Sequence, residues 1–318
     1  LYSGSEASDD DLNPYARIIV DEARRRGIAV DLVDPEHGYF ELAFGARTIA
    51  CRESLSEMTS AVAMSRCDDK RVTQRLLEKA GIEVPDNRLA ADDEANQAFL
   101  EKHGEVVVKP VRGEQGNGVS VGISDAEALR SAIALARNFD DAVLLEEYVS
   151  GEDLRIIVID GKVVAAAVRR PASITGNGSD TVETLIAKQS RRRSAATDGE
   201  SRIPVDAETE RCLAKAGVSM ESVPEEGQVI QVRDTANLHT GGTLHDVTDK
   251  LHPELVDAAV SAARTLDIPV VGLDLIVDAP DRPGYRVIEA NERPGLANHE
   301  PQPTAERFID YLFPQTTA

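Results

Sequence analysis

The stretch GLDLIVDAPDRPGYRVIEAN, residues 272–291, decides the organisation of this chain. Two apolar, β-branched runs flank a turn rich in Asp, Pro and Gly, which predicts a β-hairpin. Each run carries one acid, Asp274 in the first and Glu289 in the second, and Asn291 follows two residues after Glu289. Residues two apart share one face of a strand, so Glu289 and Asn291 are expected to point the same way.

The hairpin is expected to bring its two acids together. If the turn is symmetric about Asp281 and Arg282, Asp274 lies opposite Glu289. Two opposed carboxylates repel each other, and a divalent cation is an economical way to offset that repulsion. Two carboxylates and one amide suit Mg²⁺, so we expect a metal site at Asp274, Glu289 and Asn291. In the alternative, one acid simply faces solvent.

A second polar feature interrupts the apolar strand expected at 106–111. Lys109 lies inside this strand, and an inward lysine usually has an anion or a carboxylate as its partner. The alternative is an edge strand with Lys109 facing solvent. A glycine loop, residues 112–118, comes next, with the Gly113 to Gly118 spacing of a P-loop but without that motif's lysine or its following helix. We expect either a hairpin tip whose N–H groups cover phosphates or a plain flexible turn.

The remaining chain alternates helical and strand patterns, and predicts an α/β (α+β) fold. Helices are expected at 13–26, 68–80, 92–103, 126–139, 181–193, 253–266 and 304–313. Further strands are expected at 28–33, 39–51 (a hairpin), 119–123, 142–149, 154–159 and 163–168, the last two joined by Asp160-Gly161. Residues 171–235 are expected to be irregular apart from one helix. Three parts are expected: an N-terminal α/β domain (1–66), a small lid subdomain (67–150) and a C-terminal subdomain with the metal site (151–318).

Composition limits the classes of partner. The 318 residues include 35 basic and 56 acidic side chains, a net charge of −21, which disfavours a broad nucleic-acid or membrane surface. No apolar stretch is long enough to span a bilayer. The three cysteines, Cys51, Cys67 and Cys212, have no metal-ligand spacing, so we interpret them as free thiols in a reducing, cytoplasmic compartment.

The ordered set of these features resembles the ATP-grasp carboxylate–amine ligases. The set consists of Asp69-Lys70 at a helix head, Lys109 before the glycine loop, Glu146-Glu147-Tyr148-Val149, Asp153 and the three candidate metal ligands. The resemblance covers nearly the whole chain. It implies an ATP-grasp fold, with two α+β subdomains gripping ATP beside a small N-terminal domain. It also implies an enzyme that phosphorylates a carboxylate with ATP, after which an amine displaces phosphate to give an amide.

The resemblance also implies a role for each residue. Lys70 and Lys109 would contact the phosphates and adenine of ATP. Glu146 and Val149 would contact adenine through the backbone of a hinge, and Asp153 would hold the ribose. The full implied ATP-binding set is Lys70, Lys109, Gly113, Gly116, Gly118, Glu146, Glu147, Val149, Asp153 and Asn237. The three metal ligands would hold two Mg²⁺ ions, with Mn²⁺ as a substitute. Leu273 stands where the family often has an arginine, so the transition-state cation is expected among Arg155, Arg233 and Arg293.

Finer features resemble one branch of these ligases. Residues 155–167 and 237–243 are similar to the glutathione synthetase, ribosomal-protein glutamate ligase and cyanophycin synthetase branch. Residues 170–176 and the helix at 181–193 are similar to cyanophycin synthetases and, more closely, to the ligase region of N-acetylglutaminylglutamine synthetases. The expected reaction joins an N-acetylated glutamine-type carboxylate to an amino-acid amine. Cyanophycin-like polymerisation, glutamate addition to a peptide terminus, or a catalytically inactive nucleotide-binding module are the alternatives.

The same resemblance carries expectations about partners. ATP and small amino-acid or dipeptide substrates are expected, with no nucleic acid and no membrane. A homo-oligomer, either a dimer or a tetramer, is expected by analogy. The chain opens on Leu1 without an initiator Met, so we expect it to be a fragment that follows an acetyltransferase-like region.

Overall fold

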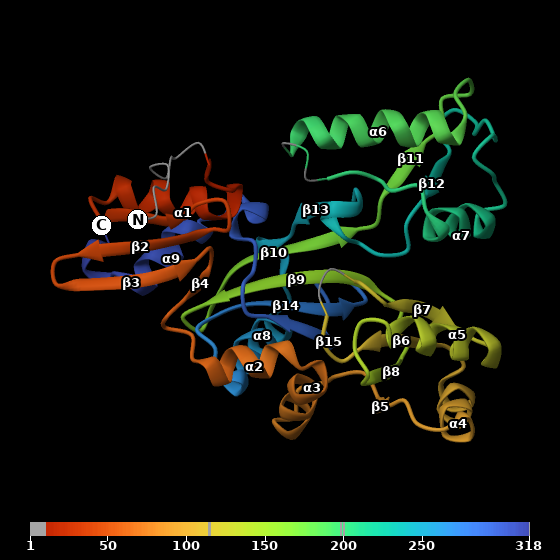
Figure 1. Cartoon of the computed structure of the whole chain (residues 1–318), viewed down its shortest axis with the longest axis horizontal. Coiled ribbons are helices and arrows are strands. Elements are labelled where there is room, and N and C mark those ends of the chain that lie inside the picture. The colour runs from red at the N-terminus through yellow and green to blue at the C-terminus, as the bar shows by residue number, and fades with distance from the viewer. Residues whose placement is uncertain (1–10, 114–115, 198, 200, 318) are drawn as a thin grey trace, which may run out of the picture. The chain divides into compact units, whose positions relative to one another are not determined.

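The computed structural model describes residues 11–113, 116–197, 199 and 201–317 (Figure 1). This part of the chain divides into two compact units. Unit 1 comprises the described residues up to Arg88, together with Val149–Ala167 and the residues from Asp246 onward, and unit 2 comprises Leu89–Tyr148 and the described residues of 168–245. Each unit is described by itself below. The three-part division at residues 67 and 151 stays a prediction.

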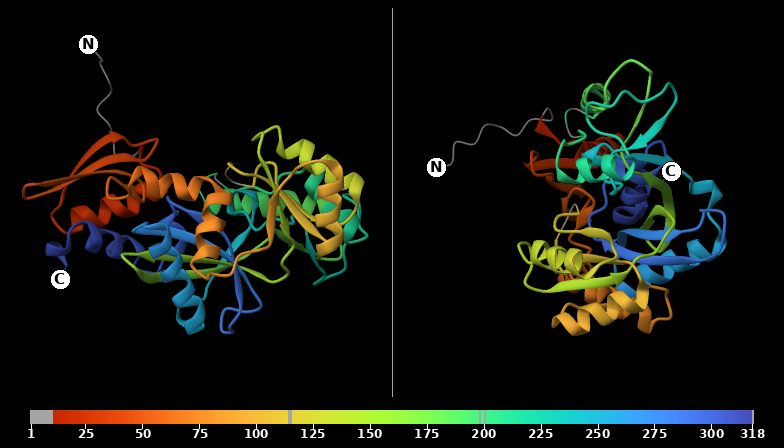
Figure 2. Two further views of the ribbon diagram at one scale, coloured as in Figure 1. Left: turned by 90° about the horizontal axis from the view of Figure 1, so that it is seen from below. Right: turned by 90° about the vertical axis from the view of Figure 1, so that its right-hand side faces the viewer.

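The N-terminal part of unit 1 is a four-stranded sheet packed on two helices. The sheet order is β1-β2-β3-β4, and the helices are α1 and α9. Their bounds are β1 (Ala29–Asp34), β2 (Tyr39–Phe44), β3 (Arg47–Arg52), β4 (Leu55–Ser56), α1 (Pro14–Arg25) and α9 (Thr304–Leu312). In the left view of Figure 2 the red strands lie on one side of α1 (red) and α9 (dark blue).

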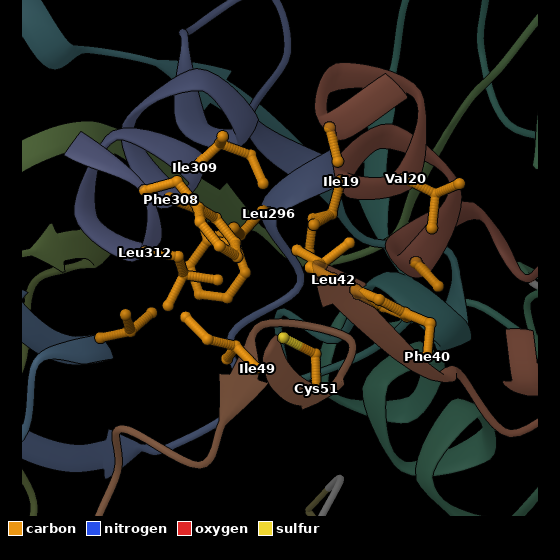
Figure 3. Packing of buried hydrophobic residues seen from close by; sticks show 14 of the residues in the cluster. Ile19, Val20, Phe40, Leu42, Ile49, Cys51, Leu296, Phe308, Ile309 and Leu312 are labelled. Atoms are coloured by element: carbon orange, nitrogen blue, oxygen red, sulfur yellow. The ribbon is translucent and has the colours of Figure 1, made fainter. Parts of the chain in front are cut away.

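The core between this sheet and its helices joins the two ends of the chain. Phe40 and Leu42 of β2 alternate with outward-facing residues and are at most 1% exposed. They pack with Ile19 of α1 and with Phe308 and Leu312 of α9 (Figure 3). Burying such large apolar side chains ties the C-terminal helix to the N-terminal sheet, since each fully buried side chain contributes about 1.5–3 kcal/mol.

A five-stranded sheet with the order β13-β10-β9-β14-β15 contains the hairpin of residues 272–291. Its strands are β13 (Thr243–Asp246), β10 (Lys162–Arg170), β9 (Glu152–Ile159), β14 (Val270–Val277) and β15 (Tyr285–Asn291). Helices α2 (Ala61–Asp68), α3 (Lys70–Lys79) and α8 (Pro253–Leu266) contact this sheet, and α9 contacts its strand β9 as well. Strand β14 is buried along most of its length, because it lies between β9 and β15.

The hairpin register confirms the predicted pairing of the two acids but corrects its centre. Asp274 of β14 lies opposite Glu289 of β15. Nearer the turn, however, Ile276 pairs with Arg286, which centres that part on Asp281 alone. A register shift between Asp274 and Leu275 restores the predicted pair.

Unit 2 contains two separate small cores. In the first, a sheet with the order β5-β8-β6-β7 packs on α4 and α5. The bounds are β5 (Asn87–Leu89, the start of which belongs to unit 1), β6 (Val106–Pro110), β7 (Ser120–Ile123), β8 (Val143–Glu147), α4 (Asp93–His103) and α5 (Ala126–Ala136). In the second, the two-stranded sheet of β11 (Ser173–Thr175) and β12 (Val229–Gln231) packs on α6 (Val182–Ala196) and α7 (Ala207–Lys215). Figure 1 shows α6 beside β11.

Most predicted elements are present, but one prediction is wrong and one helix was not predicted. The hairpin at Asp160-Gly161 is confirmed, and both turn residues have positive φ angles of 49° and 68°. Residues 171–235 are not irregular apart from one helix, because α7 and the strands β11 and β12 lie there. The residues before Asp68 also form the unpredicted helix α2. Within the described ranges, no helix combines the length and hydrophobicity that crossing a membrane requires.

Candidate active site

Three charged side chains form a row across β9, β14 and β15, the strands of the five-stranded sheet that lie in unit 1 along their whole length. Arg155 of β9 lies opposite Asp274 of β14, which lies opposite Glu289 of β15. Directly opposed residues of antiparallel strands share a face, so all three side chains lie on the same side of the sheet. We call Arg155, Asp274 and Glu289 the charged row.

Basic side chains within the unit neutralise both acids of the charged row. Arg155 donates to both oxygens of Asp274, from Nε to Oδ1 and from Nη2 to Oδ2, the latter at 3.0 Å. Lys70 Nζ lies 3.1 Å from Glu289 Oε1. Two protein cations offset the repulsion between the acids in this structure, and the predicted divalent cation stays a prediction. These contacts also place Lys70 beside the charged row.

Lys70 reaches the row because a helix begins at that point. Asp69 is the N-cap of α3 and accepts an N–H bond from Val72 at 3.0 Å. The helix start fixes the position of Lys70, which is only 6% exposed. The predicted helix-head lysine is thus confirmed in position.

Asn291 lies near the same acid. Its Nδ2 donates to the Gly272 carbonyl at 3.4 Å and to Asp274 Oδ2 at 3.5 Å, both of them long contacts. The glycine at position 272 leaves the space that Arg155 and Pro294 occupy, because an added Cβ there would lie 2.9 Å from Arg155 Nη1 and 2.9 Å from Pro294 Cβ. The predicted set of Asp274, Glu289 and Asn291 is therefore gathered on one face of the hairpin.

The donor chemistry of this set fits Mg²⁺. Two carboxylates and an amide supply the oxygen ligands that Mg²⁺ prefers, and ATP phosphates and water usually complete its octahedron. Asp274 and Glu289 would hold the ion through their carboxylates and Asn291 through its amide oxygen. Nowhere in the described ranges do three or more His, Cys, Asp or Glu side chains gather as a metal cluster.

The second predicted arginine of this region, Arg293, follows the hairpin. Its Nη1 donates to Glu53 Oε2 at 2.8 Å. Glu53 comes from the turn between β3 and β4, so the N-terminal sheet supplies the acid that holds Arg293. Glu53 was not predicted from the sequence, because one acid in a turn between strands carries no pattern of its own.

In unit 2, Lys109 of β6 is paired with Glu146 of β8. Lys109 Nζ lies 2.6 Å from Glu146 Oε1, and these side chains are 5% and 3% exposed. Val107 is opposite Glu146, so Lys109 and Glu146 are diagonal neighbours on one face. This face is opposite to the one that packs on α4 and α5. The predicted inward lysine with a carboxylate partner is confirmed, and the edge-strand alternative is wrong because β6 lies between β8 and β7.

The glycine loop connects the adjacent antiparallel strands β6 and β7, as the sequence predicts. Gly113, Gly116 and Gly118 have φ angles of 151°, 77° and 72°, which favour glycine. At Gly118 an added Cβ would lie only 2.6 Å from the ring of Phe139. Residues 114 and 115 lie outside the described part of the chain.

The predicted hinge coincides with a boundary between the units. The chain passes from unit 2 to unit 1 between Tyr148 and Val149. Before this boundary, Glu147 Oε2 lies 3.4 Å from His103 Nδ1. After it, Val149 and Asp153 are both half-buried, Asp153 in β9. Their predicted contacts with adenine and ribose stay predictions.

Arg233 and Asn237 lie in the second core of unit 2. Arg233 Nη1 lies 2.6 Å from Asp206 Oδ1, and its Nη2 lies 2.5 Å from Glu208 Oε2. Asn237 caps a 3₁₀ turn, Leu238–Thr240, by accepting an N–H bond from His239 at 2.9 Å. The two ion pairs favour a structural role for Arg233, whose predicted catalytic role no contact supports.

Known proteins resemble this chain in sequence and in fold. Residues 67–178 match the family model described as a RimK-like ATP-grasp domain. Cyanophycin synthetase from a Nostoc species is 32% identical over 96% of this chain and 36% of that protein. The glutathione biosynthesis bifunctional protein GshAB from Clostridium perfringens is 28% identical over 96% of this chain and 41% of that protein. The crystal structure of a bifunctional glutathione synthetase from Pasteurella multocida superposes with a TM-score of 0.70 at 24% identity, covering 96% of this chain and 44% of that one.

These similarities confirm the predicted ATP-grasp fold, and residues 67–178 are similar to RimK-like ATP-grasp domains. The chain spans well under half the length of the curated relatives it matches.

Proposed function

We propose that this chain is an ATP-dependent carboxylate–amine ligase that forms an amide bond through an acylphosphate. This reaction requires a site for Mg²⁺ and cations for phosphate oxygens near one another. It requires no protein nucleophile. Phosphoryl transfer depends mainly on positioning and charge neutralisation, which oxygen ligands and basic side chains supply. The ATP-grasp fold and the named synthetases that the chain resembles support this proposal.

The observation that carries the proposal is the charged row with Lys70 and Asn291. Asp274 is 6% exposed and Lys70 is 6% exposed, so these charges lie where water screens them little. When the metal ion is bound it supplies charge neutralisation of the transferred phosphoryl group. Arg155 and Lys70, which neutralise the acids in this structure, are then available to phosphate oxygens.

The proposed reaction balances without a protein nucleophile. A carboxylate oxygen of the donor attacks the γ-phosphorus of ATP, and the bond to the bridging oxygen breaks, so ADP leaves. The amine then attacks the acyl carbon, phosphate leaves with the former carboxylate oxygen, and the amine loses a proton. The products are an amide, ADP and inorganic phosphate.

Amino acids and short peptides are the proposed substrates. The named relatives, cyanophycin synthetase and a glutathione biosynthesis protein, favour an acid and an amine of this class. Within the class, we propose an N-acetylated glutamine-type donor and an amino-acid amine, because residues 170–176 and 181–193 carry that finer resemblance. Cyanophycin-like extension is the second candidate, and the identity of 32% over 96% of the chain favours it. Two Mg²⁺ ions, Mn²⁺ as a substitute and a homo-oligomer are further parts of the proposal.

A substrate panel tests this proposal. The chain is incubated with MgATP and pairs of donor and acceptor: N-acetylglutamine with glutamine or its amide, an aspartate-rich peptide with arginine, a peptide terminus with glutamate, and γ-glutamylcysteine with glycine. Phosphate release identifies active pairs, and mass spectrometry identifies products. A single dipeptide product supports the N-acetylglutamine assignment, whereas repeated additions support cyanophycin-like extension. ATP binding without product from any pair would contradict the ligase proposal.

A further inference from the structure

The loop that follows the candidate metal strand is held by the N-terminal sheet of unit 1. This loop, residues 293–295, begins two residues after Asn291. Arg293 Nη1 donates to Glu53 Oε2 at 2.8 Å, and Ser54 Oγ donates to the Pro294 carbonyl at 2.7 Å. Ser54 is only 1% exposed. Both contacts come from the two-residue turn between β3 and β4.

Glu53 is itself fixed by contacts from two other elements. Its Oε1 accepts a bond from Asn13 Nδ2 at 3.0 Å, and its backbone N–H donates to the Gly38 carbonyl at 2.8 Å. Asn13 uses its other side-chain atom, Oδ1, to cap α1 through the N–H of Ala16. Gly38 leaves no space for a side chain, since an added Cβ would lie 2.6 Å from Glu53 Cγ. Each Glu53 oxygen therefore has its own partner.

The backbone of Glu53 is strained. Its φ angle of 52° lies in the left-handed region that residues other than glycine rarely adopt. Such a conformation persists where the surroundings over-determine it, and it often marks a functional position. In this conformation the carboxylate contacts Arg293, and the Glu53 side chain is 14% exposed.

Arg293 keeps donors for a ligand. Among the contacts recorded for the described residues, Glu53 engages only Nη1, and the Arg293 side chain is 24% exposed. The loop also lies beside the charged row, because a Cβ added at Gly272 would lie 2.9 Å from both Pro294 Cβ and Arg155 Nη1. A guanidinium with free N–H groups at such a place suits an oxyanion.

We propose that Glu53 is a positioning residue for Arg293, and that Arg293 so held binds an oxyanion of a substrate. The oxyanion is a phosphate of ATP or the donor carboxylate, which share this chemistry. The inference rests on the proposed function for the identity of the substrate. It assigns to the N-terminal sheet a direct part in substrate binding, in addition to its packing on α1 and α9.

The test compares Glu53→Gln, Arg293→Lys and the double variant with the wild-type chain. Glu57→Gln is the matched control, because Glu57 is an exposed glutamate in the turn directly after β4. Each protein is assayed for kcat, for the KM of ATP and of the carboxylate donor, and for thermal unfolding. We expect Glu53→Gln to raise one KM about tenfold with little change in kcat or unfolding temperature, since one charge-assisted contact is weakened. Glu53→Asp should recover part of the loss.

Three outcomes decide the proposal. A shift in the KM of ATP assigns the phosphate, and a shift in the KM of the donor assigns the carboxylate. Arg293→Lys should raise the KM of the Glu53→Gln variant little further, because both substitutions disrupt the same interaction between Glu53 and Arg293. Wild-type KM values in Glu53→Gln, fully additive effects, or a loss that only follows a lowered unfolding temperature would each overturn it.

A binding measurement separates this proposal from the ligase proposal. If the wild-type chain forms no amide, the ligase proposal fails, but binding of inorganic phosphate still reports on the Arg293 site. Calorimetry should then show phosphate binding weakened about tenfold, to the same extent in Glu53→Gln, Arg293→Lys and the double variant. Equal phosphate affinity in wild type and Glu53→Gln would overturn the positioning role of Glu53.

Discussion

Two arginines predicted to be catalytic, Arg155 in unit 1 and Arg233 in unit 2, are both held by acids but in different ways. The acids around Arg233 already have backbone partners: Asp206 Oδ1 accepts N–H bonds from Glu208 and Thr209, and Glu208 Oε1 accepts one from Asp234. Asp274, the partner of Arg155, contacts the side chains of Arg155 and Asn291 and lies opposite Glu289. Asp206 caps α7 and so stabilises the fold, whereas Asp274 lies beside a second carboxylate and an amide, a donor set that suits a metal. The comparison separates a structural cluster from a candidate active site.

The largest expected effect comes from removing the charges of the carboxylates in the charged row. We expect Asp274→Asn with Glu289→Gln to lower ATP-dependent turnover about 10³-fold or more, because the transferred phosphoryl group loses its metal ligands. The unfolding temperature should also fall, because the buried Lys70 and the partly buried Arg155 lose their carboxylate partners, so turnover is measured where the variant is folded. Phosphate release under saturating MgATP measures the first quantity and thermal unfolding the second. Unchanged turnover would show that these residues do not hold the metal.

Removing each arginine in turn should separate the two clusters. Arg233→Met should lower the free energy of unfolding by about 2–3 kcal/mol, because it leaves Asp206 and Glu208 without their cation, although both are partly exposed. Arg155→Met also leaves a buried acid, Asp274, without its cation and should lower stability, but it alone should lower turnover of the folded protein as well. Denaturant unfolding and kcat at a temperature where both variants are folded make the comparison. If Arg233→Met abolished turnover in a fully folded protein, the structural role assigned to Arg233 would be wrong.

A low pH should weaken the ion pairs that Arg233 forms with Asp206 and Glu208. Burial alone would raise the pKa of Asp206, but the N–H bond from Thr209 and the charge of Arg233 outweigh it, so this pKa lies below its ordinary value. A carboxyl with a lowered pKa in the folded state contributes stability above its unfolded pKa and loses it as pH falls through the folded value. We therefore expect stability to fall below about pH 4, and to fall less steeply in Asp206→Asn. Unfolding temperatures from pH 3 to 6 measure this, and identical slopes would contradict it.

The smallest effect concerns the cysteines of the two units. Burial raises the pKa of Cys67 in unit 1 to about 12 and that of Cys212 in unit 2 to about 11. The thiolate is the reactive form, so alkylation at pH 8 should be slow at both sites in the folded protein and rapid in denaturant. Mass spectrometry of the labelled protein over time reports which unit opens first. Immediate labelling of both cysteines would contradict their burial.

The hairpin shows how far sequence reasoning reaches. Alternation and turn residues predict the strands and the Asp274–Glu289 pair, because both are local properties of residues 272–291. The register shift beside Asp274 is invisible to that reasoning, as it depends on the strands that pack around the hairpin. Arg155 and Lys70, which neutralise the acids, are more than 100 residues away in the chain, so only the fold brings them there.

The second core of unit 2 shows where such reasoning fails. Strands β11 and β12 are three residues long, too short for an alternation to be recognised. Helix α7, with the sequence AETERCLAK, presents few apolar positions over only nine residues. Glu53 was missed for a related reason, because its importance comes from Arg293, a residue 240 positions away.

Transfer of ¹⁸O from the donor to phosphate tests the central proposal most directly. A donor labelled with ¹⁸O in its carboxylate is incubated with the chain, MgATP and the amine, and the released nucleotide and phosphate are analysed by mass spectrometry. Formation of an acylphosphate predicts ADP and inorganic phosphate that contains one ¹⁸O atom for each amide formed. Amide formation with unlabelled phosphate, or with ¹⁸O in AMP, would contradict the proposed mechanism.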